Sequence, residues 1–341
     1  MKARWLGIST VVVLSTATLA GAGQPDDVPS PEAVRRSVER GLVIVQTAAR
    51  NYPSHRQCFS CHHQTLPMFA MTAARDAGIE MDAELLGEQM EFTQNALLPR
   101  RERLEQGESI GGRAATATYA LWTYGIAGEE PDDLSRALIA YLLKTQNEDG
   151  SWRPPSNRPP MEKSPLTTTT LALYGLERYA VEEQQTDVAD ATQQAREWIA
   201  SAAADSHEDR VMRLWALHEM GTDEETINTA RQALLESQKD DGGWPQLAEM
   251  TSDAYATGQA LWVLRTTGTP PTEPAVLRGV AYLLETQEED GSWHVVTRSK
   301  PIQVFFDNGD PHGKDQFISI PATAWAVAGL AQTLVAEADS R

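Results

Sequence analysis

Three stretches of the sequence share one pattern: QNEDGSW at residues 146–152, QKDDGGW at 238–244 and QEEDGSW at 287–293. Each stretch follows a segment whose apolar residues recur with helical periodicity. Asp-Gly ends such a helix well, because glycine accepts the left-handed conformation that commonly follows a helix. The tryptophan is expected to fold back over the helix end, as a wedge between neighbouring hairpins. The pattern therefore predicts a repeated helical hairpin.

Two kinds of helical segment alternate along the chain. The first begins with small or hydroxyl residues and continues apolar, which suits closely packed inner helices; it occurs at 65–77, 114–124, 167–179, 209–220, 254–265 and 322–334. The second is more polar and suits outer helices; it occurs at 31–50, 81–106, 135–145, 187–203, 223–237 and 274–286. Six such pairs can form an open solenoid or close into a ring. We expect the ring, an all-α (α/α)6 toroid that forms a single domain over residues 31–341.

The repeats resemble the QW motifs of squalene/hopene cyclases and of protein prenyltransferase β-subunits, over residues 31 to 335. The resemblance implies the α/α toroid, which thioester-containing complement domains share, but fold alone does not imply cyclase chemistry. The chain lacks the D-x-D-D motif with which such cyclases protonate their substrate, which argues against terpene cyclisation. Where prenyltransferases have a D-x-Y-H zinc motif, this chain has DAYA at 253–256. If the toroid instead binds or converts an apolar isoprenoid lipid, Asp253 and Tyr255 are candidate polar groups in its cavity.

Both cysteines of the chain lie in the stretch CFSCH at residues 58–62. The C-x-x-C-H spacing resembles the attachment motif of c-type cytochromes. There the two thiols add to the two haem vinyl groups, and the adjacent histidine becomes an axial iron ligand. The motif predicts one covalent haem c on Cys58 and Cys61, with His62 as the proximal iron ligand.

Three other interpretations of the cysteines stay open. The simplest is a disulfide between Cys58 and Cys61. The second is a zinc site that uses both thiols with His62 or His63 and takes a fourth ligand from another hairpin. The third is a thioester between Cys61 and Gln64, since thioester domains on this toroid place a C-G-E-Q stretch at a similar point.

The longest connection between predicted helices, residues 294–316, contains the stretch DNGDPHGKD at 307–315. Loops of this length inside a compact domain are often functional. Ring closure would place the sixth hairpin beside the first, so we expect this loop to lie against residues 58–62. His312 is the first candidate for a distal iron ligand, and His294 is the second.

Charge and composition restrict the partners. The 341 residues include 29 Lys and Arg against 48 Asp and Glu, a formal net charge of −19. This balance argues against nucleic acid, which is bound through cationic side chains, and it favours a basic protein if the redox partner is a protein rather than a small molecule. Hydrophobic residues make up 41% of the chain, enough for a large core.

The N-terminus has the pattern of a secretory signal peptide. Lys2 and Arg4 precede an apolar run at 5–19, which is followed by the small residues AGA at 20–22. We expect a signal peptide at 1–22, a short linker at 23–30, no stable membrane span after processing, and a periplasmic or extracellular location.

These observations together predict a secreted haem protein that performs electron transfer or haem-based redox chemistry, and they leave it uncertain whether the protein is an enzyme. Two alternatives stay open. One is a toroid that binds or converts an isoprenoid lipid, and the other is a non-catalytic scaffold with a Cys58–Cys61 disulfide.

Overall fold

The computed structural model describes residues 28–300 and 304–335. The predicted signal peptide at 1–22 lies outside the described residues. The outer helices are α1 (Pro31–Asn51), α3 (Ala83–Leu97), α4 (Arg101–Glu105), α6 (Asp133–Thr145), α8 (Gln185–Ser201), α10 (Glu224–Leu235) and α12 (Pro274–Thr286). The inner helices are α2 (Leu66–Asp76), α5 (Arg113–Ala127), α7 (Pro165–Tyr179), α9 (His207–Glu219), α11 (Ala254–Thr266) and α13 (Gln316–Leu334). A two-stranded ribbon pairs β1 (Trp244–Pro245) with β2 (Ser252–Asp253) in antiparallel register.

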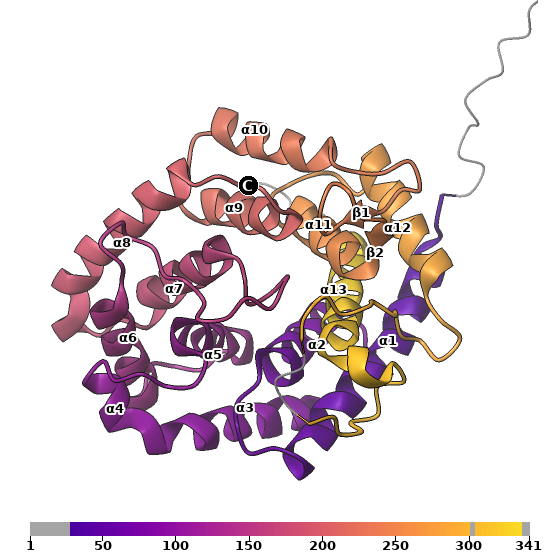
Figure 1. Cartoon of the computed structure of the whole chain (residues 1–341). Helices are drawn as coiled ribbons and strands as arrows, with labels where there is room; N and C mark the ends of the chain where they lie inside the picture. The colour runs from indigo at the N-terminus through magenta and orange to yellow at the C-terminus, as the bar shows by residue number, and fades with distance from the viewer. Residues whose placement is uncertain (1–27, 301–303, 336–341) are drawn as a thin grey trace, which may run out of the picture.

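Figure 1 shows the outer helices around the periphery and the inner helices within them, so the predicted all-α toroid is confirmed. One predicted outer helix, 81–106, is interrupted by a short 3₁₀ turn at Leu98–Arg100 and continues as α4. Pro99 lies in this turn. Proline lacks the backbone N–H that a continuous helix needs.

Each Q-x-x-D-G-x-W turn fastens one outer helix to the next. The three tryptophans are almost fully buried, and each indole Nε1 donates to a leucine carbonyl ten residues earlier at 2.9–3.0 Å. The wedge predicted from the sequence is therefore confirmed. The glutamine Nε2 of each turn donates to a backbone carbonyl of the following outer helix: Gln146 to Ala191, Gln238 to Ala275 and Gln287 to Ser37.

The third turn closes the ring, because its following outer helix is α1. Gln287 Nε2 donates to the Ser37 carbonyl at 2.9 Å, although the two residues are 250 positions apart in the sequence. In the opposite direction, the Arg40 guanidinium donates a hydrogen bond of 2.9 Å to the carbonyl of Glu289. The last helix, α13, packs against α1, α2 and α11. The closed ring is therefore present, rather than the open solenoid. We call this junction between the last and the first hairpins the seam.

Aromatic side chains of the inner helices fill the centre of the ring. Phe69 contacts Trp122, Trp262 and Trp325 with ring centroids 5.0–5.4 Å apart, and Trp215 lies 5.2 Å from Trp262. All five side chains are buried. The inner-helix tryptophans therefore pack against one another as core and fill the centre of the ring.

Residues Gly313–Leu334, which include α13, form one helical segment that is long and apolar enough to cross a membrane by composition. Most of this segment is buried inside the ring. Its apolar character follows from contact with other inner helices on several sides. We interpret α13 as a core helix of the toroid.

Candidate functional site

The C-x-x-C-H stretch lies at the mouth of the ring, the face where outer helices lead into inner ones. A π-helical turn at Cys61–Thr65 precedes α2, and the Gln64 side-chain oxygen accepts a hydrogen bond of 2.9 Å from the Ser60 backbone N–H. This bond fixes the turn, since it satisfies an N–H that the helix leaves unpaired. Cys58, Cys61 and His62 thereby line one cavity of about 350 Å³.

The two thiols differ in their surroundings. Cys58 is exposed, and the Tyr52 hydroxyl donates to its carbonyl oxygen at 3.0 Å and lies 3.4 Å from its sulfur. Cys61 is less accessible, and burial raises the pKa of its thiol well above the ordinary value. Neither cysteine is in a disulfide. The Gln64 side chain is hydrogen-bonded to Ser60 and Gln89.

The two histidines that follow face different neighbours. His62 packs edge-on against Phe317, with ring centroids 4.7 Å apart, and burial holds its pKa well below the ordinary value. His63 is fully enclosed. The Asn308 amide donates to its Nε2 at 2.6 Å, so this nitrogen accepts and the ring is neutral. Burial lowers the pKa of His63 to about 3, in agreement with a neutral ring.

The long loop does lie against the C-x-x-C-H stretch, as predicted. Asn308 binds His63, and the Phe306 ring packs 5.8 Å from both Tyr52 and His63. His312, the predicted distal ligand, lies in that loop but away from the cavity of Cys58. Its ring stacks on that of His294 at a centroid distance of 4.5 Å, and neither ring lines the cavity of Cys58.

A second cavity, of about 130 Å³, adjoins the first. His62 and Arg158 line both cavities. Arg158 pairs with Glu162 at 2.8 Å, and its guanidinium lies 4.1 Å from the centroid of the Phe317 ring. Both members of the ion pair are largely shielded from solvent. The pair and the aromatic ring therefore form a wall between the two cavities.

The part of the connection between α6 and α7 that follows the Q-x-x-D-G-x-W turn, residues 153–164, crosses the mouth of the ring. We call it the mouth loop. In Figure 1 it reaches inward from α7 toward α2 and α13. Met161 is 1% exposed and belongs to the core, and the Ser299 hydroxyl donates to the Pro159 carbonyl at 3.0 Å. The mouth loop is therefore packed into the site.

A buried carboxyl group, which the sequence interpretation did not single out, lies among the inner helices. Glu208 accepts hydrogen bonds from Tyr255, Gln259 and Thr167 at 2.8–2.9 Å. Burial raises its pKa above the ordinary value. Tyr119, which lines the larger cavity, is within electrostatic range of Glu208 and of Cys61. Glu208 directly precedes the predicted inner helix at 209–220, and no motif in the sequence marks it.

The two polar residues predicted for the isoprenoid alternative have different roles. Asp253 caps α11 by accepting from the Ala256 N–H at 2.9 Å, and its other oxygen accepts from Gln246. Tyr255 points into the ring and binds Glu208. Burial raises the pKa of Asp253 to about 6. Tyr255 therefore belongs to the interior polar cluster, while Asp253 secures a helix end.

Comparisons with known proteins agree with this architecture. The family model of the squalene-hopene cyclase C-terminal domain matches residues 195–340. No curated protein sequence matches the chain. The structure of the type II terpene cyclase MstE from Scytonema is similar at 15% identity and a TM-score of 0.57, covering 90% of this chain and 99% of that one. A variant of that cyclase in complex with geranylgeranyl dihydroxybenzoate, its substrate, gives 14% identity, a TM-score of 0.57, and coverage of 89% and 98%.

A glycosidase variant is also similar, at 12% identity and a TM-score of 0.61, covering 90% of this chain and 98% of that one. Because these identities are low and the activities differ, the likeness to solved structures establishes the toroid fold alone. The chain thus has the toroid that terpene cyclases and such glycosidases share.

The prediction of haem-based electron transfer is wrong. The family match of residues 195–340 indicates a terpene-cyclase-like toroid, as does the likeness of nearly the whole chain to a terpene cyclase. The resemblance to squalene cyclases and prenyltransferases is supported, and the cytochrome-like interpretation of the chain is not. Attachment of a porphyrin to Cys58 and Cys61, with His62 on the iron, stays a prediction, and these three residues do line a common cavity.

Proposed function

We propose that the mouth of the ring binds an apolar isoprenoid lipid. The observation that carries this proposal is the lining of the smaller cavity, where Phe305, Phe306 and Phe317 surround the space. Aromatic faces offer a large apolar area at a low cost in conformational entropy, which suits a long unsaturated chain. We treat the two adjoining cavities as one site, since His62 and Arg158 line both of them.

Exposed apolar side chains at the same place support an entrance for such a ligand. Val304 is 83% exposed and Phe305 is 54% exposed, and both line the smaller cavity. Large apolar side chains that gather beside a cavity commonly mark a binding site. The centre of the ring is filled by its aromatic core, so a ligand is expected to enter and leave through the mouth.

The charges around this cavity favour an isoprenoid with an anionic end. Lys300, Lys314 and Arg158 line the smaller cavity, and Glu162, which lines the larger one, is paired with Arg158. This local balance is opposite to the net charge of the whole chain. A phosphate or carboxylate would find charge-assisted hydrogen bonds here, while the chain of the lipid lies against the phenylalanines.

A binding assay with a fluorescent geranylgeranyl analogue, with and without a terminal phosphate, tests the proposal. Phe305→Ser combined with Phe317→Ala should weaken binding at least tenfold, about 1.4 kcal/mol. Val43→Ser is the matched control, because Val43 is 60% exposed on the outer helix α1. If the double variant and the control bind the geranylgeranyl analogue with equal affinity, the proposal is wrong.

Acid-catalysed conversion of the bound lipid is the second candidate, and Glu208 favours it. A carboxyl group whose pKa is raised by burial can hold a proton at higher pH than usual and deliver it to a substrate. Since the chain lacks the D-x-D-D motif, we take Glu208 as the candidate acid, within electrostatic range of Tyr119, a residue of the larger cavity.

Glu208→Gln separates binding from conversion. Glutamine keeps the shape and an acceptor oxygen but has no proton to give. The lipid should still bind, and any new product detected by gas chromatography of extracts should disappear. If the wild-type protein returns the lipid unchanged, the toroid binds without converting. If the Glu208→Gln protein forms product at the wild-type rate, Glu208 is not the acid.

A further inference from the structure

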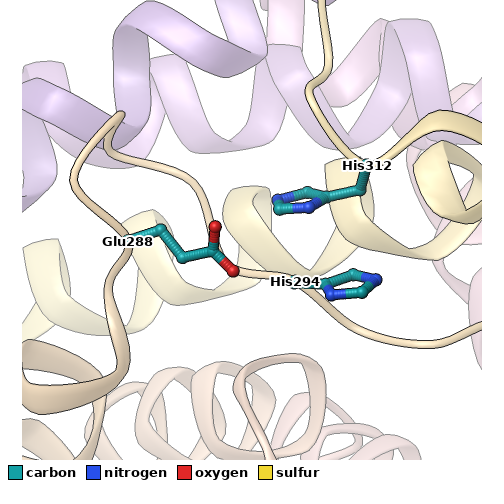
Figure 2. A group of neighbouring side chains, drawn as sticks. All are labelled: Glu288, His294 and His312. Carbon is teal, nitrogen blue, oxygen red and sulfur yellow. The ribbon is translucent and has the colours of Figure 1, made fainter.

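Three side chains that are distant in sequence converge at the seam of the ring. Glu288 lies in the third Q-x-x-D-G-x-W turn, His294 follows its tryptophan, and His312 lies in the long loop before α13. One ligand atom from each lies within 4.8 Å of the other two. Figure 2 shows the Glu288 carboxylate directed toward the two imidazole rings.

Each imidazole is oriented by a neighbouring polar group. His294 Nε2 lies 3.0 Å from Asp315 Oδ2, and His312 Nε2 lies 2.8 Å from the Ser292 hydroxyl. A carboxylate or hydroxyl on one ring nitrogen fixes the tautomer and leaves the other nitrogen as a metal ligand. The Nδ1 atoms are therefore the ones available to a cation. The two rings are parallel to within 5°.

A buried carboxylate beside the histidines supplies a separate reason to expect a cation. Asp310 is only 6% exposed, and one of its oxygens accepts from the His312 backbone N–H at 2.9 Å. Its other oxygen, Oδ2, is buried and has no hydrogen-bond partner among the described residues. An unpaired buried carboxylate oxygen is costly unless positive charge lies nearby.

The other two repeats show that this cluster is not a property of the turn itself. The position of Glu288 is occupied by Asn147 and Lys239 in those turns, and both side chains are bound within their own turn region, to Ser151 and Ala248. The position after the tryptophan, which is His294 here, is occupied by Arg153 and Pro245. The set of metal-binding side chains therefore occurs only in the repeat at the seam.

We propose that Glu288, His294 and His312 bind one divalent transition-metal ion, of which Zn²⁺ fits best, with Asp310 as a nearby counter-charge. Imidazole nitrogens and a carboxylate oxygen are common zinc ligands, and three protein ligands leave a fourth position for water. Ligand atoms at a tetrahedral zinc are roughly 3.3 Å apart, by the bond lengths of such sites. Glu288 and His294 are exposed, so small side-chain rotations can bring the three atoms together.

Binding of zinc would connect the long loop to the turn that joins α12 to α1. This junction is the last that the ring needs in order to close. The ion is therefore expected to stabilise the seam, because a ligand that binds only the folded chain raises its stability.

Zn²⁺ titration by isothermal calorimetry, after chelator treatment and dialysis, tests the proposal on the full mature chain. The wild-type protein should bind one equivalent and unfold at a higher temperature with Zn²⁺. His294→Gln with His312→Gln should weaken this binding more than 100-fold, while Asp315→Asn should weaken it about 10–100-fold. His218→Gln is the control, because His218 is an exposed histidine of α9.

A second series excludes the thiols as the ligands. Cys58→Ser with Cys61→Ser should leave the affinity for Zn²⁺ unchanged, and the Co²⁺ form of the wild type should show no thiolate charge-transfer band. Absence of any bound equivalent in the wild type overturns the proposal. So does binding that survives in the double histidine variant, or that is lost only in the double cysteine variant.

Discussion

Replacing Gly291 with alanine tests the closure of the ring at a single atom. Gly291 has φ +96°, and a Cβ placed on it would lie 2.7 Å from the backbone carbonyl oxygen of Arg40 in α1. An L-residue in a left-handed conformation costs about 1–2 kcal/mol. Forcing an extra methyl group against backbone that cannot rotate away adds about 1–3 kcal/mol. The substitution should therefore lower the free energy of unfolding by about 2–5 kcal/mol.

Two other glycines separate these terms. Gly78 also has a positive φ, of +71°, but a Cβ there meets nothing within 4 Å, so Gly78→Ala should cost only the conformational part. Gly242 has φ +85° and a Cβ that would lie 2.8 Å from the Arg278 carbonyl oxygen. Gly242→Ala should therefore match Gly291→Ala, since it meets the same obstacle between α10 and α12.

Equilibrium urea unfolding of the three variants, followed by circular dichroism, measures these free energies. In a closed ring, Gly291→Ala and Gly242→Ala cost similar amounts, and both cost more than Gly78→Ala. If Gly291→Ala behaves like Gly78→Ala, α1 does not contact the third turn in solution. The chain would then be an open solenoid, and the reasoning from the seam would fail.

Three further substitutions test other parts of the structure. Burial raises the pKa of Asp253 to about 6 from 3.8, so its contribution to stability is complete below pH 4 and is lost as the pH rises through 6. Thermal unfolding measured across this pH range should show the free energy of unfolding fall by about 3 kcal/mol. Asp253→Asn should remove this fall; a variant whose pH profile equals that of the wild type contradicts the assignment. Thr323→Val should cost about 1–3 kcal/mol in urea unfolding, because it leaves the buried N–H of Trp293 without its acceptor; a cost near zero would mean that water replaces the hydroxyl. Met161→Ala should cost about 2–5 kcal/mol and speed proteolysis of the mouth loop, whereas a neutral result would show that this loop is not packed into the core.

Much of the architecture was predictable from sequence, because the residues of each repeat determine how its helix ends and which helix it contacts. Asp-Gly ends a helix, the tryptophan covers that end, and the glutamine reaches the next outer helix. These are local interactions whose residue types and spacing are visible in the chain. The break at Leu98–Arg100 was missed because the helical periodicity continues on both sides of Pro99.

The candidate site was predictable only in part. Ring closure correctly placed the long loop against residues 58–62, but it could not give the direction of individual side chains. His312 turns toward His294 rather than toward the cavity of Cys58, since Ser292 holds its Nε2. Glu208 carries no recognisable motif, and its importance depends on three donors that come from other inner helices.

The five-residue C-x-x-C-H motif is a weaker guide to the function of this chain than the repeats. C-x-x-C-H specifies a local arrangement of two sulfurs and an imidazole. The repeats specify the toroid in which that arrangement is embedded, and the family model of a cyclase domain matches residues 195–340, which contain two of the three repeats.

The position of α13 has a consequence for how the chain folds as it is made. This helix is the last of the ring to be synthesised, and it packs against α1 and α2, which are among the first. Contacts between residues that are so distant in sequence form slowly. Until α13 is complete, one apolar side of the first hairpin has no partner, so a nascent or truncated chain is expected to be prone to aggregation and to depend on chaperones.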